Sequence, residues 1–241
     1  MINKDSAVQR SLPLYISAPQ ACEYLADEVA QNIFISPDVD MNAELYEHLL
    51  GVGFRRSGKF VYRPRCETCK ECIPCRVQAN QFRPSRSQKR VLSTNKDLAV
   101  QSMSAAFSAE HYELYLKYQR HKHPGGNMET FSEEAYEEFI CQSLGTSAFL
   151  ETRLDDKLLA VAVTDVFSNS LSAVYTFFDP KHLKRSLGTF SILKQIEKAQ
   201  QLGKDYLYMG YYIEACSKMS YKPNFKPVEF YLDETWQAKI E

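Results

Sequence analysis

Residues 147–179 read SAFLETRLDDKLLAVAVTDVFSNSLSAVYTFFD. The stretch contains three apolar runs, which are separated by short polar turns at Asp155-Asp156 and at Ser168-Asn169-Ser170. Apolar runs of this length with polar turns between them are typical of consecutive antiparallel strands. The stretch therefore predicts a three-stranded β-meander at the centre of the fold.

Helical patterns lie on both sides of the meander. Ser108 and Ser132 can each cap a helix before it, and Ser186 begins a helix after it. Two more strands are expected at residues 205–213 and 228–232. Two helices, three strands, a helix and two strands form the order of the GNAT acyltransferase core. This order predicts an α+β fold in which residues 91–241 form a GNAT-like domain with a mostly antiparallel sheet.

The first 90 residues have a different composition. Asn42 can cap a short helix, and residues 60–78 read as two strands that pair across a cysteine-rich loop. Residues 81–96 are polar and basic and are interrupted by a proline. Such a stretch is typical of a linker, so we expect a domain boundary near residue 90. Residues 1–90 would then form a small, cysteine-rich, basic domain.

Residues 66–75, CETCKECIPC, place a cysteine at every third position. Neighbouring thiolates repel one another unless a cation neutralises them, so this spacing favours a metal site. Zinc and an iron–sulfur cluster both take four cysteines, and the spacing does not separate them. Reduced free thiols are the alternative, because disulfides are disfavoured in the cytoplasm. The candidate ligands are Cys66, Cys69 and Cys72, with Cys22 or Cys75 as the fourth.

The net charge of −1 is unevenly distributed along the chain. Residues 51–96 contain twelve Lys and Arg and only two acidic residues. This excess, with aromatic residues interleaved, favours a phosphate-bearing partner over an ordinary solvated surface. The chain has no run of 18 apolar residues, and residues 1–19 lack the apolar core of a secretory signal. We therefore expect a cytoplasmic protein with no membrane segment.

Seven stretches of the sequence match, in the same order, a family of bacterial aminoacyl-tRNA–protein transferases. Over nearly its whole length the sequence resembles the aspartate/glutamate leucyltransferases of that family. The matching stretches are CEYL (22–25), GFRRSG (53–58), YRPRCETCKEC (62–72), SQKR (87–90), YTFFDP (175–180), SLGTFSIL (186–193) and YMGYYIEACSKMSYKPNFKP (208–227).

The resemblance implies an enzyme that moves leucine from leucyl-tRNA to the N-terminal amine of proteins beginning with Asp or Glu. We expect this enzyme to be a monomer. The product would be marked for degradation by the N-degron pathway. The family pattern has an apolar residue at the position of Cys75, which implies that Cys22 is the fourth cysteine ligand.

An aminoacyl ester is already activated, so the reaction itself requires no cofactor. The enzyme must hold the amine against the ester carbonyl and stabilise the oxyanion that forms. The candidate catalytic residues are Tyr211, Tyr212 and Tyr175. Adjacent residues of a strand face opposite sides, so at most one of Tyr211 and Tyr212 can face the substrates.

Substrate binding requires cations, because both the tRNA and the acidic acceptor are anionic. Lys218 and Lys222 are the candidates for the acceptor carboxylate, and Tyr221 lies in the same matching stretch. Gly188, near the start of a predicted helix, is a candidate for an anion site at the helix N-terminus. The residues expected to contact tRNA phosphates are Arg55, Arg56, Lys89 and Arg90.

Three alternatives remain open from the sequence. The donor could be arginyl-tRNA instead of leucyl-tRNA. A GNAT N-acetyltransferase using acetyl-CoA would share the fold, but a lone Gly188 makes an incomplete CoA loop. A nucleic-acid-binding module built on a zinc knuckle would leave the second half of the chain unexplained.

Overall fold

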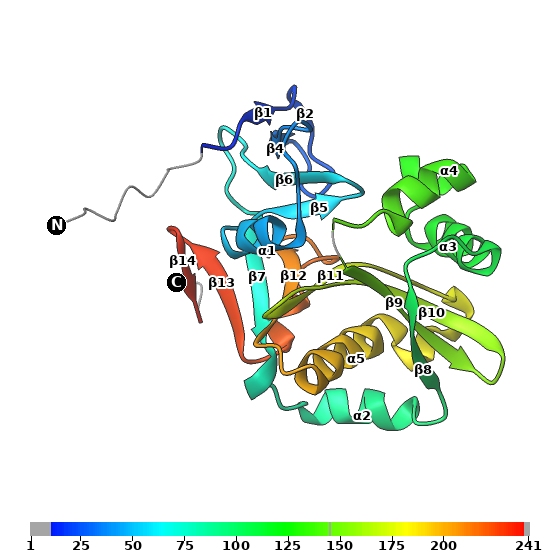
Figure 1. Ribbon diagram of the computed structural model, residues 1–241. Helices are drawn as coiled ribbons and strands as arrows, with labels where there is room; N and C mark the ends of the chain where they lie inside the picture. The colour runs from blue at the N-terminus through cyan, green and yellow to red at the C-terminus, as the bar shows by residue number, and fades with distance from the viewer. Residues whose placement is uncertain (1–10, 145, 239–241) are drawn as a thin grey trace.

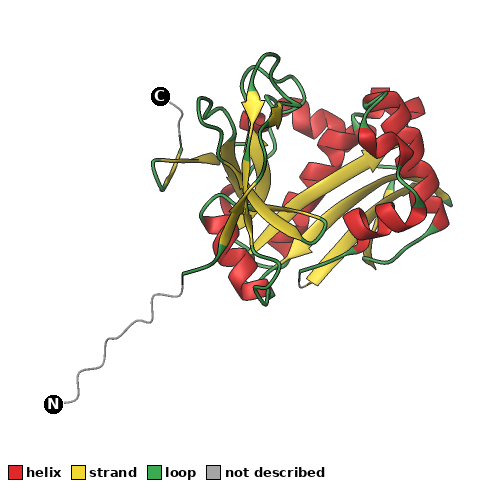
Figure 2. Cartoon of the chain, turned by 90° about the horizontal axis from the view of Figure 1, so that it is seen from above, coloured by secondary structure: helices red, strands yellow, loops and turns green. Residues whose placement is uncertain are grey.

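The computed structural model describes residues 11–144 and 146–238. Residues 1–10, part of the stretch that was read for a secretory signal, lie outside this range. The described part contains a four-stranded and an eight-stranded sheet, together with the helices around them (Figures 1 and 2).

The larger sheet has the strand order β14-β13-β7-β12-β11-β10-β9-β8. The predicted meander is confirmed, because β10 pairs antiparallel with both β9 and β11, and Val161 lies opposite Glu151 and Phe177. Only β11 and β12 are parallel among the described pairs of this sheet, so the expected mixed fold with a mostly antiparallel sheet is confirmed. The strands are β7 (Ile73–Gln78), β8 (Ala99–Ser104), β9 (Thr146–Leu154), β10 (Lys157–Val166), β11 (Ser170–Phe178), β12 (Tyr206–Tyr212), β13 (Val228–Leu232) and β14 (Thr235–Gln237).

Strand β7 comes from the N-terminal part of the chain but lies inside the larger sheet. Val77 pairs with Leu207 of β12 on one side and with Val228 of β13 on the other. The sequence predicted a hairpin within residues 60–78, which is wrong, because the strand before the cysteine loop belongs to the smaller sheet. Residue 90 lies within helix α2, and the chain segments on either side of it contribute strands to one sheet.

Helices lie on both faces of the larger sheet (Figure 1). On one face, α5 packs through Leu193 against Leu207, and α2 packs on α5. On the other face, α3 and α4 pack through Tyr115 and Tyr136 against Phe177. No helix in the described part of the chain is long and apolar enough to cross a membrane. The helices are α1 (Ala43–Gly51), α2 (Arg86–Thr94), α3 (Ala109–Lys122), α4 (Glu133–Tyr136), which continues as a π-helical turn (Glu137–Cys141), and α5 (Leu187–Gln201).

The smaller sheet has the order β1-β4-β6-β5 and packs on α1. The predicted cap of α1 is confirmed, because the Asn42 side chain accepts a hydrogen bond from the Leu45 amide. Ile33 and Val61 pack with Tyr208 of β12, whose neighbour Leu207 contacts α5, so this part lies on the face opposite α5. In Figure 2 the strand-rich N-terminal part lies beside the helix-covered part. The strands are β1 (Leu14–Ile16), β4 (Asn32–Ile35), β5 (Arg55–Ser57) and β6 (Phe60–Pro64), and β2 (Gln20–Ala21) with β3 (Val29–Ala30) forms a separate pair.

Candidate active site

The parallel strands β11 and β12 stay together over only three residue pairs, which end at Ser172 opposite Tyr208. Beyond this point β11 continues along β10, while β12 continues along β7 with an irregularity between Tyr208 and Tyr211. Gly210 lies within that irregularity and has a φ of +71°, which a glycine adopts without strain. The two strands therefore diverge at the middle of the sheet. A cavity of about 10 Å³, room for about one water, lies there.

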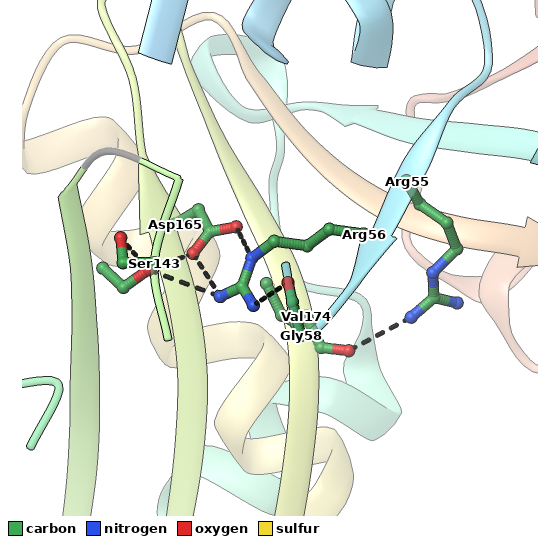
Figure 3. Close-up of polar contacts among 7 residues, drawn as sticks. Arg55, Arg56, Gly58, Ser143, Asp165 and Val174 are labelled. Atoms are coloured by element: carbon green, nitrogen blue, oxygen red, sulfur yellow. Dashed lines mark hydrogen bonds and ion pairs between the residues drawn. The ribbon is translucent and has the colours of Figure 1, made fainter. Parts of the chain in front are cut away.

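Arg55 of β5 reaches into this gap. Its Nη2 donates a hydrogen bond to the Val174 carbonyl oxygen of β11 at 3.3 Å (Figure 3). Its guanidinium carbon lies 5.8 Å from the centre of the Tyr211 ring. Within residues 11–144 and 146–238, Arg55 forms no ion pair with a carboxylate. A guanidinium has several N–H donors in a planar fork. Arg55 thus offers donors to an anion at the point where the strands part.

Arg56 points to the opposite side of β5, where its guanidinium is engaged in contacts within the protein (Figure 3). Its Nε and Nη2 donate to the two carboxylate oxygens of Asp165 at 2.6 and 2.7 Å. Its Nη1 donates to the Gly58 carbonyl oxygen, and Ser147 also donates to Asp165. Arg56 is almost fully buried. The structure thus places Arg56 in an internal ion pair, and its contact with tRNA phosphates stays a prediction that this burial does not favour.

The three candidate tyrosines lie in different surroundings. The Tyr211 hydroxyl donates to the carbonyl oxygens of Gly53 and Tyr62, at 3.1 and 3.3 Å. Burial raises the pKa of Tyr211 well above 10, so its phenol stays protonated near neutrality and supplies no base. Tyr175 is half-buried, and its hydroxyl accepts a hydrogen bond from Gln119 Nε2 at 2.8 Å.

Tyr212 lies away from the gap. Its ring packs on Phe230, 5.4 Å between centroids, in the core that α5 covers. The alternation of β12 therefore separates Tyr211 from Tyr212, as expected for adjacent strand residues. Tyr212 therefore does not face the gap together with Tyr211, and its catalytic role stays a prediction.

Lys222 is buried, which the sequence did not predict. Its Nζ donates to the Tyr211 carbonyl oxygen and lies 3.3 Å from Met219 Sδ. Burial lowers the pKa of Lys222 to about 8, although a Cys75 thiolate would oppose the shift. Lys222 is 3% exposed and already hydrogen-bonded, so its contact with an acceptor carboxylate stays a prediction that its burial does not favour.

Lys218 and Tyr221 remain accessible on the loop after β12. Lys218 Nζ lies 3.3 Å from His123 Nδ1, and its charge adds to burial in lowering the pKa of that imidazole. The Tyr221 ring is 39% exposed and lies 6.0 Å from Lys222 Nζ. Burial raises the pKa of Tyr221 to about 12, and the Arg55 guanidinium lies near enough to oppose this shift. The substrate roles of Lys218 and Tyr221 stay predictions.

The other predicted substrate residues are separated from Arg55 by the sheet. Lys89 and Arg90 are exposed on α2, which packs on α5 and so lies on the opposite face from β5 (Figure 1). Lys89 and Arg90 are therefore on a different face from Arg55, and their contact with tRNA phosphates stays a prediction. Gly188 lies in the first turn of α5, where a β-carbon would come 3.3 Å from the Phe178 ring. Close packing of helix on strand explains this glycine.

Four cysteines from two loops gather near one another. Cys72 lies close enough to Cys66, Cys69 and Cys22 for their charges to add to burial in raising its pKa to about 12. Cys75 lies apart in the core, with its Sγ 3.5 Å from the Gly210 carbonyl oxygen. In the described part of the chain, no group of three or more His, Cys, Asp and Glu side chains is arranged to hold a metal ion.

Sequence reasoning missed two residues that shape this site, although both leave a signal. Gly210 interrupts a tyrosine-rich strand pattern, and an isolated glycine inside a strand suggests a bulge. Asp165 is the one acidic residue in the apolar run LLAVAVTDVF, and a buried carboxylate needs a partner. Neither signal identifies the arginine that lies beside Gly210 or the one that pairs with Asp165. Arg55 and Arg56 are both far from these residues in the sequence, and they are the same residue type.

The sequence matches known families in two segments. Residues 20–90 match the family described as "Arginine-tRNA-protein transferase, N terminus", and residues 110–232 match "Arginine-tRNA-protein transferase, C terminus". The chain is therefore an aminoacyltransferase.

Curated relatives make the assignment narrower. Proteins named "Aspartate/glutamate leucyltransferase" from Saccharophagus degradans and Pseudomonas fluorescens are 46% and 44% identical to this chain. The alignments cover 95% and 93% of this chain and 98% and 96% of those proteins. This chain belongs to the aspartate/glutamate leucyltransferase family. Among solved structures, FemX aligns over 83% of this chain and 79% of its own at 8% identity, with a TM-score of 0.45, too low to support an argument about the fold.

Proposed function

We propose that this chain transfers leucine from leucyl-tRNA to the N-terminal α-amine of proteins that begin with Asp or Glu. The amine nitrogen attacks the ester carbonyl carbon, a C–N bond forms, and the bond to the ribose oxygen of the tRNA breaks. The proton lost by the amine ends on the released ribose hydroxyl, directly or through water. Family membership supports the reaction, and the GNAT-like order of helices and strands is consistent with acyl transfer.

The observation that carries the acceptor preference is the guanidinium of Arg55 in the gap between β11 and β12. A carboxylate that enters such a place unpaired would cost several kcal/mol. Arg55 can accept it in a bidentate pair, because Val174 occupies only one of its donors in the described structure. An Asp or Glu side chain held there would place its own α-amine beside the point where β11 and β12 diverge.

The chemistry is supplied mainly by positioning. An α-ammonium group titrates near about 8, so a useful fraction is neutral at physiological pH without a strong base. Tyr211 keeps its proton and Lys222 is occupied by the Tyr211 carbonyl oxygen. Water accessible at the gap can take the amine proton, and N–H groups of Arg55 can stabilise negative charge on the way to product.

The test is a transfer assay with tRNA charged with labelled leucine or arginine and peptides that begin with Asp, Glu, Asn or Lys. We expect leucine to enter Asp and Glu peptides. In Arg55→Gln, the preference in kcat/KM for Asp over Asn should fall by about 10- to 100-fold, because a hydrogen bond to a charged group is lost. Lys218→Gln is the matched control and should keep the preference.

Three outcomes would contradict the proposal. Transfer of arginine but not leucine would assign a different donor. No transfer from either tRNA would reject the enzyme activity. The third outcome is an unchanged preference for Asp over Asn peptides in Arg55→Gln together with a loss of this preference in Lys218→Gln. It would show that the loop after β12 selects the acceptor.

We further propose that Cys22, Cys66, Cys69 and Cys72 bind one structural zinc ion or iron–sulfur cluster. The proximity of these four thiols supports this set, and the burial of Cys75 away from them speaks against Cys75 as a ligand. Metal analysis of purified protein should find zinc or iron, which Cys72→Ser loses and Cys75→Ala retains. Equal metal content in both variants would contradict the set.

We also propose that the protein acts as a monomer in the cytoplasm and that the added leucine marks the acceptor for degradation. Sedimentation equilibrium checks the first point. Comparing the half-life of an Asp-initiated reporter in cells with and without this protein checks the second.

A further inference from the structure

The smaller sheet carries a straight row of side chains that ends at Arg55. Tyr15 of β1 lies opposite Phe34 of β4, Phe34 lies opposite Tyr62 of β6, and Tyr62 lies opposite Arg55 of β5. Directly opposed residues of neighbouring strands share one face of a sheet. We call Tyr15, Phe34 and Tyr62 the aromatic row.

The Phe34 and Tyr62 rings of the aromatic row lie side by side, and the strand register places Tyr15 next to Phe34. The Phe34 and Tyr62 centroids lie 5.6 Å apart, and Tyr62 lies 6.4 Å from Tyr211, beside the gap. Phe60, two residues before Tyr62 and therefore on the same face, lies 6.5 Å from Phe34. The row therefore joins the outer edge of the smaller sheet to the candidate active site.

Much of this face is exposed, although it is apolar. Tyr15 is 56% and Phe60 is 50% exposed, while Ile33 and Val61 on the opposite face are buried against α1. Exposed aromatic rings that follow one another across a sheet are a common platform for single-stranded nucleic acid, because every base can stack on them.

The charge around the aromatic row fits the same partner. Residues 54–65, which form the β5–β6 hairpin, contain five Lys and Arg and no acidic residue. Lys59 Nζ lies 5.6 Å from the centre of the Phe60 ring. Lys59 and exposed Arg65 form no ion pair within the described parts of the chain. Both can therefore meet phosphates that pass along the face.

Given the proposed transfer from leucyl-tRNA, we propose that the aromatic row and Phe60 bind the unpaired 3′ end of the aminoacyl-tRNA. The bases stack on Tyr15, Phe34 and Phe60, and the cations of the hairpin contact the backbone. The aminoacyl ester is thereby led to the gap beside Arg55 and Tyr211.

The test uses an RNA hairpin that carries the acceptor stem with its single-stranded 3′ end, and the same hairpin without those 3′ nucleotides. Tyr15→Leu and Phe60→Leu keep apolar side chains at exposed positions but remove the rings. Each should weaken binding of the hairpin with the 3′ end by roughly 5- to 150-fold, the range for loss of one stacked base. Neither should change binding of the hairpin that lacks it.

Two control variants separate stacking from general effects. Tyr15→Phe keeps the ring and should bind as the parent does. Phe107→Leu removes another ring, 37% exposed on the segment before α3, and should leave binding unchanged. Thermal unfolding of each variant shows that the fold is retained.

Equal affinity of parent, Tyr15→Leu and Phe60→Leu for the hairpin with the 3′ end would overturn the proposal. So would a raised KM for the acceptor peptide with RNA affinity unchanged, because the face would then hold the acceptor chain. In either case, leucine transfer by the parent would show that the proposed function stands without this surface.

Discussion

At the scale of single residues, Gly210 decides whether Arg55 can occupy the gap between β11 and β12. A β-carbon built on Gly210 would lie 2.9 Å from Arg55 Nη1, closer than the two atoms can approach. The glycine also has a φ of +71° at the irregularity of β12. The backbone conformation and the missing side chain thus both serve the placement of one guanidinium.

We predict that Gly210→Ala lowers kcat/KM for Asp peptides at least tenfold and lowers the free energy of unfolding by about 1–2 kcal/mol. Gly203→Ala is the matched control, because Gly203 has a φ of +65° but no atom within 4 Å of the added methyl group. It should show a similar loss of stability with near-parent activity. Equal activity of the two variants would mean that Arg55 need not lie at Gly210.

The buried Lys222 predicts a dependence of stability on pH. Its pKa is about 8 in the folded protein and about 10.4 in an unfolded chain, so the unfolded state binds more protons between these values. The contribution of Lys222 to the free energy of unfolding therefore rises with pH across this window, by about 3 kcal/mol in total.

Urea unfolding of the parent and Lys222→Met at pH 7, 8, 9 and 10 measures this contribution. Relative to the parent, Lys222→Met should be most stable at pH 7 and should lose that relative advantage towards pH 10. A difference that stays constant over the series would mean that Lys222 keeps its ordinary pKa.

At the scale of elements, Arg56 and Asp165 join the smaller sheet to β10 of the larger one. Breaking one partner of a buried ion pair leaves an uncompensated charge and costs about 3–5 kcal/mol. We predict a loss of this size in the free energy of unfolding of Arg56→Met, measured in urea. The double variant Arg56→Met with Asp165→Leu should recover much of it, because both charges are then gone.

The exposed pair of Arg185 and Asp97 provides the comparison. Its Nη2–Oδ2 distance of 2.8 Å is similar to that of the buried pair, but the Asp97 side chain is 45% exposed. Arg185→Met should therefore change stability far less than Arg56→Met. A double variant as unstable as Arg56→Met alone would show that lost packing, and not the charge, accounts for the effect.

Elements with strong local patterns were predictable from the sequence, and those whose place depends on distant partners were not. The meander of residues 147–179 and the Asn42 cap of α1 carry their signals locally. Helix α2 was missed because residues 81–96 are polar, although its Ser85–Gln88 capping box can be read from the sequence. The alternation of apolar and polar residues along β7 is compatible with a place in either sheet, so the pairing of this strand was predicted wrongly.

The same limit applies to the candidate site. The sequence selected Arg55, Tyr211 and Lys222 as important, but a cation can be exposed, paired or buried without any change in its neighbours along the chain. Lys222 is buried, and its Nζ donates to the Tyr211 carbonyl oxygen instead of facing solvent. Adjacent Arg55 and Arg56 face opposite sides of β5, and only the fold shows which of them finds a carboxylate.

At the scale of the whole molecule, the basic stretch of residues 51–96 is not one continuous surface. Arg56 pairs with Asp165, and Arg76 pairs with Glu229 at 2.7 Å while it lies 3.6 Å from the Tyr206 ring centre. The helix that carries Lys89 faces away from β5. The hairpin of residues 54–65 therefore provides the cations that lie beside the site.

The shared sheet predicts how the chain responds to a cut between its two halves. A protease site inserted after Lys96, in the turn between α2 and β8, allows the chain to be cleaved after folding. We predict that the two fragments stay together in size-exclusion chromatography, because β7 remains hydrogen-bonded between β12 and β13. After separation in urea, neither fragment alone should show a cooperative unfolding transition. Two fragments that part and each melt cooperatively would show autonomous domains.

The position of β7 also sets an order of events during synthesis on the ribosome. Residues 73–78 leave the exit tunnel long before Leu207 and Val228, the partners of Val77, have been made. Both edges of this strand are unpaired during that interval and are open to other extended chains. The larger sheet can be completed only when the last strands emerge, and pairing over such long sequence separations is slow. Growing chains of this protein should therefore depend on nascent-chain chaperones until translation is nearly complete.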